Sequence, residues 1–186
     1  MKIILASKSP RRKELLALTG FNFECKEADI DETIDNSLSL EDAIIEVAYH
    51  KANHVYTDNK DSIVIGADTI VTLDGVVYGK PKDREDAYRM LKTFSGRIHD
   101  VITGVAIVSD QSIEKFASVT KVKMYELTDE EIYNYIDTAE PMDKAGAYGI
   151  QGIGSLLIES IDGDFYTVMG LPIAKLNREL VTMVRG

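Results

Sequence analysis

The 186-residue sequence contains a single cysteine, Cys25, so no disulfide can form within the chain. We therefore expect a reducing, cytoplasmic location. Cys25 lies in an alternating, strand-like run, and we interpret it as a strand residue rather than a catalytic thiol. No apolar run approaches the roughly 18 residues of a membrane span, and the N-terminal apolar segment is too short for a signal peptide. The sequence thus predicts neither secretion nor membrane insertion.

Basic residues are also scarce relative to acidic ones. The chain has 21 Lys and Arg against 31 Asp and Glu, a formal net charge of −10 and a pI near 4.8. Such a global field repels nucleic acids and anionic lipids, and no aromatic residues are interleaved with a basic patch. We therefore expect neither nucleic acid nor membrane as a partner. An anionic substrate would need a local cationic pocket or a metal ion.

Internal repeats and low-complexity segments are absent as well. The length fits one domain, or one domain pinched into two lobes, over residues 1–186. Strands are predicted at 3–6, 21–30, 62–72, 76–78, 97–108, 113–125, 156–160 and 166–169. Helices are predicted at 10–19, 39–56, 83–96, 128–137 and from 172 onward, with a glycine-rich loop at 146–154. The two types mix without a strict βαβ rhythm, which indicates an α/β fold with a mixed sheet.

The turn between the first strand and the first helix carries the first candidate site. Lys8, Arg11 and Arg12 crowd a helix N-terminus, where the helix dipole disfavours cations and favours anions. Ser7 and Ser9 add hydroxyl donors, and the planar fork of arginine suits phosphate oxygens. This pattern favours a phosphate site. The alternative is a solvated basic turn that pairs with nearby acids.

Asp68 interrupts an otherwise apolar strand at 63–71. A carboxylate in such a place is costly unless it is paired or binds a metal. Gly66 and Ala67 are small, so another group can approach the backbone closely there. One interpretation is a metal ligand or general base. The other is a structural ion pair, for example with Arg97.

Two lysine positions allow both a structural and a functional interpretation. Lys80 and Lys82 stand at a strand exit, which is usually a solvated loop. Lys51 borders the apolar face of its helix, where it would either extend its ammonium group to solvent or point into a cleft.

Residues 143–154 contain four glycines, which allow close approach of a ligand to the backbone. Gln151 offers both a donor and an acceptor, which suits recognition of a base edge. The segment matches neither the P-loop nor the dinucleotide fingerprint, so glycine spacing alone leaves a plain flexible loop equally open.

Taken together, these segments resemble the Maf proteins, the septum-formation-inhibitor family of nucleoside triphosphate pyrophosphatases. The resemblance covers essentially the whole chain. Its motifs are Leu5-Ala6-Ser7-Lys8-Ser9-Pro10-Arg11-Arg12-Lys13-Glu14-Leu15-Leu16, Gly66-Ala67-Asp68-Thr69, Lys80-Pro81, Ser95-Gly96 and Lys144-Ala145-Gly146-Ala147-Tyr148-Gly149-Ile150-Gln151-Gly152.

The resemblance implies a house-cleaning hydrolase that converts a nucleoside triphosphate to the monophosphate and pyrophosphate with a divalent cation, Mg²⁺ or Mn²⁺. It also implies a mixed, bent sheet flanked by helices around a deep cleft, similar to inosine triphosphate pyrophosphatases, and often a homodimer. The alternative is a non-enzymatic, nucleotide-binding regulator of cell division and septum formation.

Roles for individual residues follow from the same resemblance. Asp68 matches the proton acceptor. Positions tied to substrate choice are matched by Arg11, Thr69 and Gln151. Residues expected to line the cleft are Ser7, Arg12, Lys51 and Lys80. Glu32, in a short acidic run, matches an acidic partner that would bind metal together with Asp68.

The substrate branch is indicated by two positions. Family members that act on 7-methyl-GTP usually have Gln after the aspartate and Glu at the later site, where this chain has Thr69 and Gln151. A neutral amide suits a pyrimidine that offers two carbonyls and an N3–H. The resemblance therefore implies the dTTP and UTP branch, possible modified pyrimidine nucleotides included.

Overall fold

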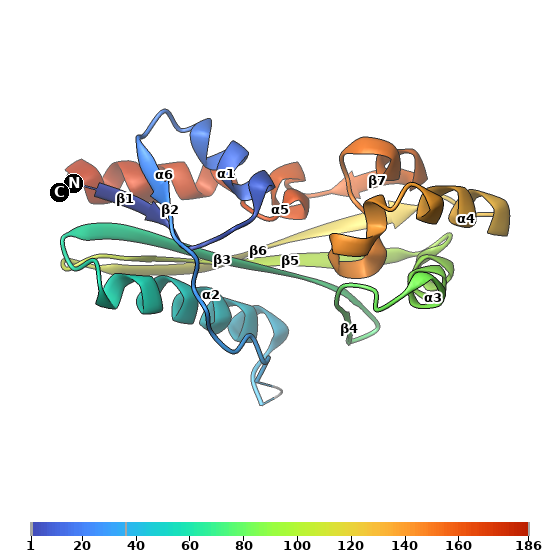
Figure 1. The fold of residues 1–186 in the computed structure, drawn as a ribbon, viewed down its shortest axis with the longest axis horizontal. Helices are drawn as coiled ribbons and strands as arrows, with labels where there is room; N and C mark the ends of the chain where they lie inside the picture. Colours follow the sequence, from blue (N-terminus) through green and yellow to red (C-terminus); the bar gives the residue numbers. More distant parts are fainter. Residues whose placement is uncertain (1, 36, 186) are drawn as a thin grey trace. The chain divides into compact units, whose positions relative to one another are not determined.

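The computed structural model of the chain describes residues 2–35 and 37–185, and its strands form a seven-stranded mixed sheet flanked by helices (Figure 1). The expected α/β class is therefore confirmed. In chain order the elements are β1 (Lys2–Leu5), α1 (Pro10–Ala17), β2 (Phe23–Cys25), α2 (Leu40–Thr57), β3 (Ser62–Leu73), β4 (Val76–Tyr78), α3 (Arg84–Phe94), β5 (Ile98–Val108), β6 (Ile113–Met124), α4 (Asp129–Asp137), η1 (Glu140–Asp143), η2 (Ala145–Ala147), η3 (Gly152–Leu157), β7 (Ile158–Asp162), α5 (Phe165–Met169) and α6 (Ile173–Arg185). Within the described ranges, each helix is too short or too polar to cross a lipid bilayer.

The chain divides into two compact units, which we describe separately. Unit 1 comprises Met1–Thr69, Thr103–Ser118 and Gly170–Gly186, and unit 2 comprises Ile70–Ile102 and Val119–Met169. Strands β3, β5 and β6 each contribute residues to both units. The strand order is β2-β1-β3-β5-β6-β7, with β4 paired to β3.

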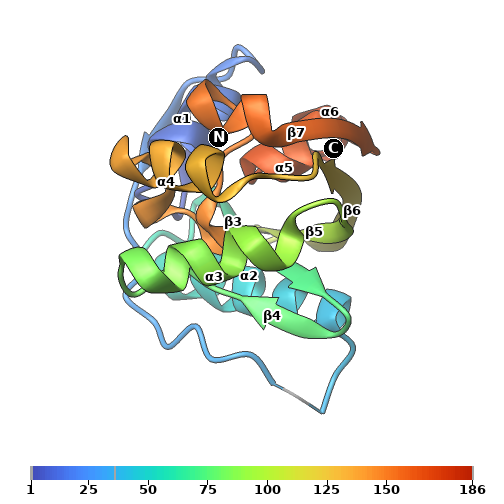
Figure 2. The same ribbon diagram turned by 90° about the vertical axis from the view of Figure 1, so that its right-hand side faces the viewer.

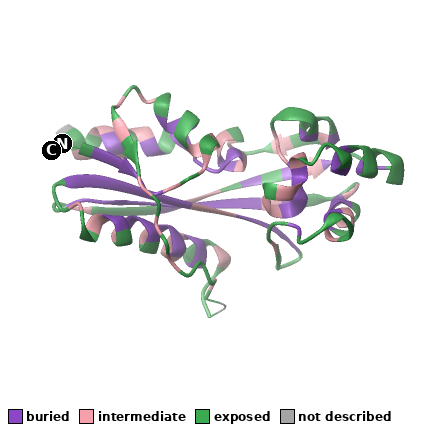
Figure 3. Cartoon of the chain, viewed as in Figure 1, coloured by how far each residue is buried: buried purple, intermediate pink, exposed green. Residues whose placement is uncertain are grey.

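In unit 1, helix α2 covers one face of the sheet, and α1 and α6 lie on the other (Figure 1). Glycines on the strands let α2 lie unusually close. A Cβ at Gly66 would stand 2.1 Å from the carbonyl oxygen of Ala48, and one at Gly104 would stand 2.5 Å from that of Ile44. The close approach expected at Gly66 is thus made by the backbone of α2. Buried residues follow the central strands and the sheet-facing side of α2 (Figure 3).

The helix starts predicted from the sequence are confirmed. In four of the five, the capping side chain accepts a hydrogen bond from the backbone N–H three residues later, at Ser9, Ser39, Asp83 and Thr128. These caps satisfy amide groups that would otherwise lack partners at the first turn.

In unit 2, helices α3 and α4 lie side by side (Figure 2). The rings of Tyr88 and Tyr133 stack with centroids 4.9 Å apart, and Lys92 Nζ lies 2.7 Å from Asp129 Oδ1. The Lys92–Asp129 ion pair is exposed and contributes little. We therefore assign most of the stability of this unit to its apolar core, which includes buried Leu91, Phe94 and Ile132.

Two predicted strands are wrong in extent or type. The strand expected at 21–30 is limited to the three residues of β2. The strand expected at 166–169 is instead the helix α5. Asp164 Oδ2 accepts hydrogen bonds from both the backbone N–H and the hydroxyl of Thr167, so Asp164 acts as a helix cap that outweighs the β-forming residues after it.

His99, in unit 2, is only 2% exposed, and its Nε2 lies 2.7 Å from the hydroxyl of Tyr148. Among the described residues, its Nδ1 has no hydrogen-bond partner. Burial lowers the pKa of His99 from 6.5 to about 4. The imidazole is therefore neutral in the folded protein at pH 7, and its protonation favours unfolding.

We expect this histidine to destabilise the protein in mild acid. In the unfolded state His99 titrates near 6.5, so below that pH the unfolded state binds more protons than the folded state does. The stability that comes from keeping His99 neutral is therefore fully present above pH 6.5 and is lost as the pH falls toward 4. At pH 5 the loss is about 2 kcal/mol relative to pH 7. Urea unfolding of wild type and His99→Gln at both pH values isolates this contribution. An equal acid loss in both proteins would contradict it.

Candidate active site

The candidate site of unit 1 lies at the carboxyl ends of the parallel strands β1 and β2, beside the middle of β3. Leu5 of β1 pairs with Cys25 of β2 on one side and with Ile65 of β3 on the other. After these positions β1 and β2 end, whereas β3 continues through residues 66–69. Loops at the carboxyl ends of parallel strands are the usual ligand sites of α/β sheets. The segments that follow β1 and β2 contain four of the predicted site residues, Ser7, Arg11, Arg12 and Glu32.

Asp68 forms an ion pair with a buried lysine on α2. Lys51 Nζ lies 2.7 Å from Asp68 Oδ1 and 2.8 Å from Glu32 Oε1. The side chain of Lys51 is 8% exposed, that of Asp68 17% and that of Glu32 57%. One ammonium group therefore joins both carboxylates that the sequence suggested as metal ligands. The pairing considered with Arg97 is not formed, because Arg97 pairs instead with Asp74 at 2.6 Å.

Arg12 is held in one orientation by two hydrogen bonds. Its Nε donates to the carbonyl oxygen of Gly170 at 2.8 Å, and its Nη2 donates to the hydroxyl of Thr69 at 3.0 Å. Thr69 Oγ1 is also 2.9 Å from Thr103 Oγ1. Burial lowers the pKa of Arg12, while the charge of Asp68 opposes this shift. The guanidinium is thus a fixed, partly desolvated cation.

Asp68 and Thr69 are neighbours on β3, so their side chains point to opposite faces of the strand. Asp68 meets Lys51 on α2, and Thr69 meets Arg12 on α1. Two adjacent residues of β3 therefore belong to different clusters on opposite faces of the strand: Asp68 lies with Lys51, and Thr69 lies with Arg12. The charge of Asp68 opposes the lowering of the Arg12 pKa by burial, so the two clusters are close enough to affect each other electrostatically.

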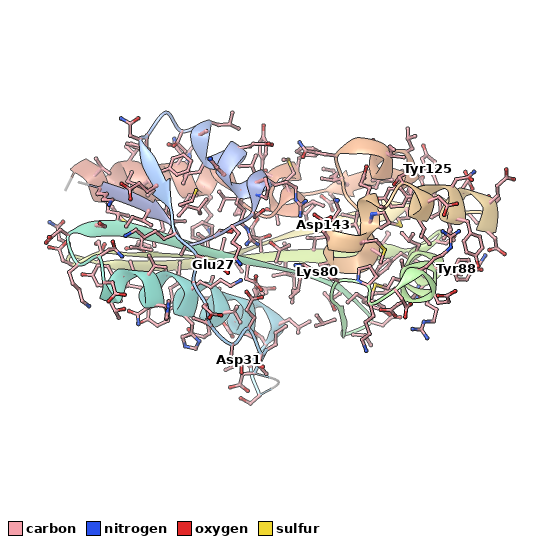
Figure 4. The ribbon with its side chains drawn as sticks, in the orientation of Figure 1. Glu27, Asp31, Lys80, Tyr88, Tyr125 and Asp143 are labelled. Carbon is pink, nitrogen blue, oxygen red and sulfur yellow. The ribbon has the colours of Figure 1, made fainter. Side chains whose placement is uncertain are left out.

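The remaining basic-turn residues lie at the N-terminus of α1. Ser7 Oγ accepts a hydrogen bond from the amide of Ser9 at 3.2 Å, and Arg11 is half-buried. Lys8 pairs with Glu27, which lies on the segment after β2 (Figure 4). Lys8 is therefore engaged with a neighbouring acid, as the solvated-turn interpretation expected, whereas Arg12 points into the protein.

Lys80 and Gln151 belong to unit 2, and both are exposed. Lys80 follows β4 (Figure 4), and the preceding Gly79 accepts a backbone hydrogen bond from Gly146 at 3.0 Å. The segment predicted as a glycine-rich loop is instead built largely of the short helical turns η2 and η3. Gln151 stands immediately before η3 with an extended backbone.

The sequence did not single out Thr103 or Gly170. Thr103 is fully buried, and Gly170 adopts a φ of +103°. A Cβ at Gly170 would lie 3.3 Å from the hydroxyl of Thr69 and 3.4 Å from Nε of Arg12. Glycine at this position therefore leaves room for the arginine to reach the backbone carbonyl.

The carboxylates of Asp68 and Glu32 fit a hard divalent cation. Mg²⁺ commonly binds one or two carboxylates and takes its other oxygen ligands from water and substrate phosphates. Both carboxylates contact the same Lys51 nitrogen, so their oxygens lie near each other. Among residues 2–35 and 37–185, no group of three or more His, Cys, Asp or Glu is arranged to hold a metal by itself. The donor set thus fits a metal that arrives with a phosphate-bearing ligand.

Fold and site together define an α/β protein with a fixed arginine and a lysine-bound carboxylate pair at the ends of parallel strands. The chain belongs to the Maf-like protein family, whose model matches residues 2–183. This confirms the family resemblance of the sequence.

Curated relatives match over nearly their full length. A dTTP/UTP pyrophosphatase of Bacillus cereus strain G9842 is 50% identical over 96% of this chain and 94% of its own. Proteins of the same name from Bacillus pumilus and Bacillus cytotoxicus are 49% and 51% identical over 97% and 96% of this chain, and over 96% and 94% of their own. Among solved structures, the Staphylococcus aureus Ham1 protein has a TM-score of 0.52 at 14% identity, covering 85% of this chain and 80% of that one. That likeness concerns the fold alone.

Proposed function

We propose that the chain is a nucleoside triphosphate pyrophosphatase that hydrolyses dTTP and UTP to the monophosphate and pyrophosphate. The observation that carries the proposal is the Asp68 carboxylate, placed in an apolar strand and paired with buried Lys51 beside the carboxyl ends of β1 and β2. The names of the curated relatives, which match nearly all of this chain, support the same activity.

Phosphate binding is assigned to the N-terminal end of α1. Arg12 is oriented by Thr69 and Gly170, and Arg11 and Ser7 lie on the same turn. A helix N-terminus and guanidinium groups both favour phosphate oxygens. We propose that these groups bind the triphosphate and stabilise the charge that develops on the departing pyrophosphate.

Proton transfer is assigned to Asp68. Its Oδ1 accepts a hydrogen bond from Lys51, which restrains the position of the carboxylate. We propose that the other oxygen, Oδ2, takes the proton from the water that attacks the α-phosphorus. Lys51 and Glu32 then act through Asp68: the lysine holds the carboxylate in place, and the glutamate balances the buried ammonium charge.

A divalent cation, Mg²⁺ or Mn²⁺, would be held by the carboxylates of Asp68 and Glu32 together with phosphate oxygens. When bound, such an ion supplies Lewis acidity and neutralises phosphate charge. Lys80, on unit 2, is proposed as a further cation for the triphosphate. The single exposed cysteine, Cys25, is compatible with the reducing cytoplasmic setting that we propose, and a second copy of the chain is the expected protein partner.

The proposed activity is tested by incubating the protein with a panel of nucleoside triphosphates, with and without Mg²⁺ or Mn²⁺. We expect one pyrophosphate for each UTP or dTTP consumed, and no turnover after chelation of the metal. Binding of these nucleotides without turnover would overturn the proposal and favour the regulator of septum formation.

Base choice is proposed to involve Arg11, Thr69 and Gln151. In the structure Thr69 contacts Arg12 and Thr103, so it would influence the substrate through the position of that arginine. Gln151 is exposed and would contact the base directly.

We expect the double change Thr69→Gln with Gln151→Glu to weaken turnover of UTP and dTTP, because it places a carboxylate opposite a pyrimidine carbonyl. A repulsive contact of this kind costs roughly 1–3 kcal/mol, or about 10- to 100-fold in kcat/KM. The measurement is kcat/KM for a panel that includes 7-methyl-GTP. Unchanged ratios across the panel would show that the base is recognised elsewhere.

A further inference from the structure

A carboxylate that the proposed reaction does not use lies beneath the glycine-rich segment of unit 2. Glu140 opens η1, and its Oε1 accepts hydrogen bonds from the hydroxyl of Tyr135 and the amide of Gly154, both at 3.0 Å. Its Oε2 accepts another from the amide of Ile153, also at 3.0 Å. One side chain thus binds two consecutive backbone amides at the start of η3.

Tyr135 extends this contact to the other side of Gln151. The tyrosine is 2% exposed, and its hydroxyl accepts a hydrogen bond from the amide of Gly149 at 3.1 Å. Burial raises the pKa of Tyr135 well above its usual value, and the neighbouring Glu140 raises it further. The phenol therefore stays protonated at neutral pH and donates to the carboxylate.

Two glycines make these contacts sterically possible. Gly152 has a φ of +72°, and a Cβ there would stand 2.7 Å from Glu140 Oε2. A Cβ at Gly154 would stand 2.6 Å from the hydroxyl of Tyr135 and 2.4 Å from the carbonyl oxygen of Gly149. Glycine is therefore required at both positions, because a side chain there would collide with the carboxylate of Glu140 or the hydroxyl of Tyr135.

Gln151 lies between the two anchored parts of the segment. It is two residues after Gly149 and two before Ile153, and both of those amides are bound to the Tyr135–Glu140 pair. The backbone of Gln151 is extended, with φ −100° and ψ 164°, and its side chain is exposed. A residue anchored on both sides has few backbone conformations available, which is the usual basis of preorganised recognition.

We propose that Glu140, with Tyr135, is a positioning residue that holds Gln151 in the conformation that recognises the pyrimidine base. This inference rests on the proposed function, because it assigns the base to Gln151. Glu140 acts through backbone amides and does not touch the substrate. It sets how selectively the enzyme accepts UTP and dTTP, and not the rate of the hydrolytic step.

The test compares Glu140→Gln and Tyr135→Phe with the control Glu130→Gln, an exposed glutamate in the first turn of α4. An amide at 140 cannot accept hydrogen bonds from all three donors. We expect KM for UTP to rise about 10-fold, kcat to change less than about threefold, and the preference for UTP over CTP to fall about 10-fold. Amide hydrogen exchange at residues 149–154 should become faster without nucleotide. The control should match the wild type in all four measurements.

A double-mutant cycle with Gln151→Ala separates positioning from a purely structural role. If Glu140 acts through Gln151, Glu140→Gln has no further effect on base preference once Gln151 is Ala. Additive effects, or a fall in kcat for all nucleotides at unchanged base preference, would overturn the proposal. If Glu140→Gln does not fold at the assay temperature, Tyr135→Phe and Glu140→Asp provide the same cycle.

The failure of this inference differs from the failure of the proposed function. Wild-type protein that releases no pyrophosphate from any nucleotide overturns the function and the inference with it. Normal turnover with an unchanged base preference in Gln151→Ala overturns the role of Gln151, and therefore the positioning by Glu140, but leaves the hydrolase intact. A changed preference in Gln151→Ala, combined with a normal one in folded Glu140→Gln, overturns the positioning alone.

Discussion

Asp68→Asn is expected to lower kcat for UTP and dTTP at least ~100-fold, the lower end of general-base contributions. Asparagine keeps the size of the side chain but removes the proton acceptor and an anionic metal ligand. KM should change less than kcat, because the triphosphate is assigned chiefly to Arg11 and Arg12 at the start of α1. The two constants are measured by pyrophosphate release at saturating metal.

The same substitution is also expected to lower stability. Among the described residues, it leaves the buried ammonium of Lys51 with Glu32 as its remaining carboxylate partner, and Glu32 is 57% exposed. Removing one member of a fully buried ion pair costs about 3–5 kcal/mol. Asn retains a carbonyl oxygen that can accept from Lys51, so we expect a smaller loss, about 1–2 kcal/mol.

Melting and turnover must therefore be measured on one preparation of Asp68→Asn. Asp74→Asn is a suitable control, since Asp74 pairs with Arg97 on the surface and is 69% exposed. The control should keep both kcat and Tm near wild-type values. Near-normal turnover of Asp68→Asn combined with a sharply lower Tm would show that Asp68 is a scaffold residue, and the mechanism would fail.

The parts of this molecule that local chemistry determines could be predicted from the sequence. A side-chain oxygen three residues before a free amide makes a helix cap, so the starts of α1 and α2 follow from Ser9 and Ser39. An acid in an apolar strand must have a partner, so Asp68 was recognisable as a site residue. Its partner was not, because the contact with Lys51 depends on how closely α2 packs on Gly66.

Other site residues cannot be recognised from the sequence around them. A buried threonine in a strand, such as Thr103, has the same pattern whether it packs or hydrogen-bonds a neighbour on another strand. Helical spacing predicts only a packing role for Tyr135, and its hydroxyl finds Gly149 and Glu140 through the tertiary fold. Glycine content likewise left ligand approach and a plain flexible loop equally open at 146–154, whereas the glycines there make room for hydrogen-bonded side chains.

Arg12→Ala is expected to lower kcat/KM about 10- to 100-fold for every accepted nucleotide, because charge-assisted hydrogen bonds to phosphate are worth roughly 1.5–3 kcal/mol. The triphosphate is common to all substrates, so the factor should be similar across the panel. Lys13→Ala is the matched control, since it removes one positive charge from the exposed side of the same helix. The control should stay within about threefold of wild type, because exposed charges are screened.

Arg12→Lys separates charge from geometry. A lysine keeps the positive charge but cannot reproduce two donors in one plane toward Gly170 and Thr69. If orientation of the cation matters, Arg12→Lys should recover only a small part of the activity lost in Arg12→Ala. A loss confined to one base in either variant would contradict the phosphate role. It would mean that Arg12 acts on base choice through its hydrogen bond to Thr69, and the triphosphate would then have to be bound by other cations.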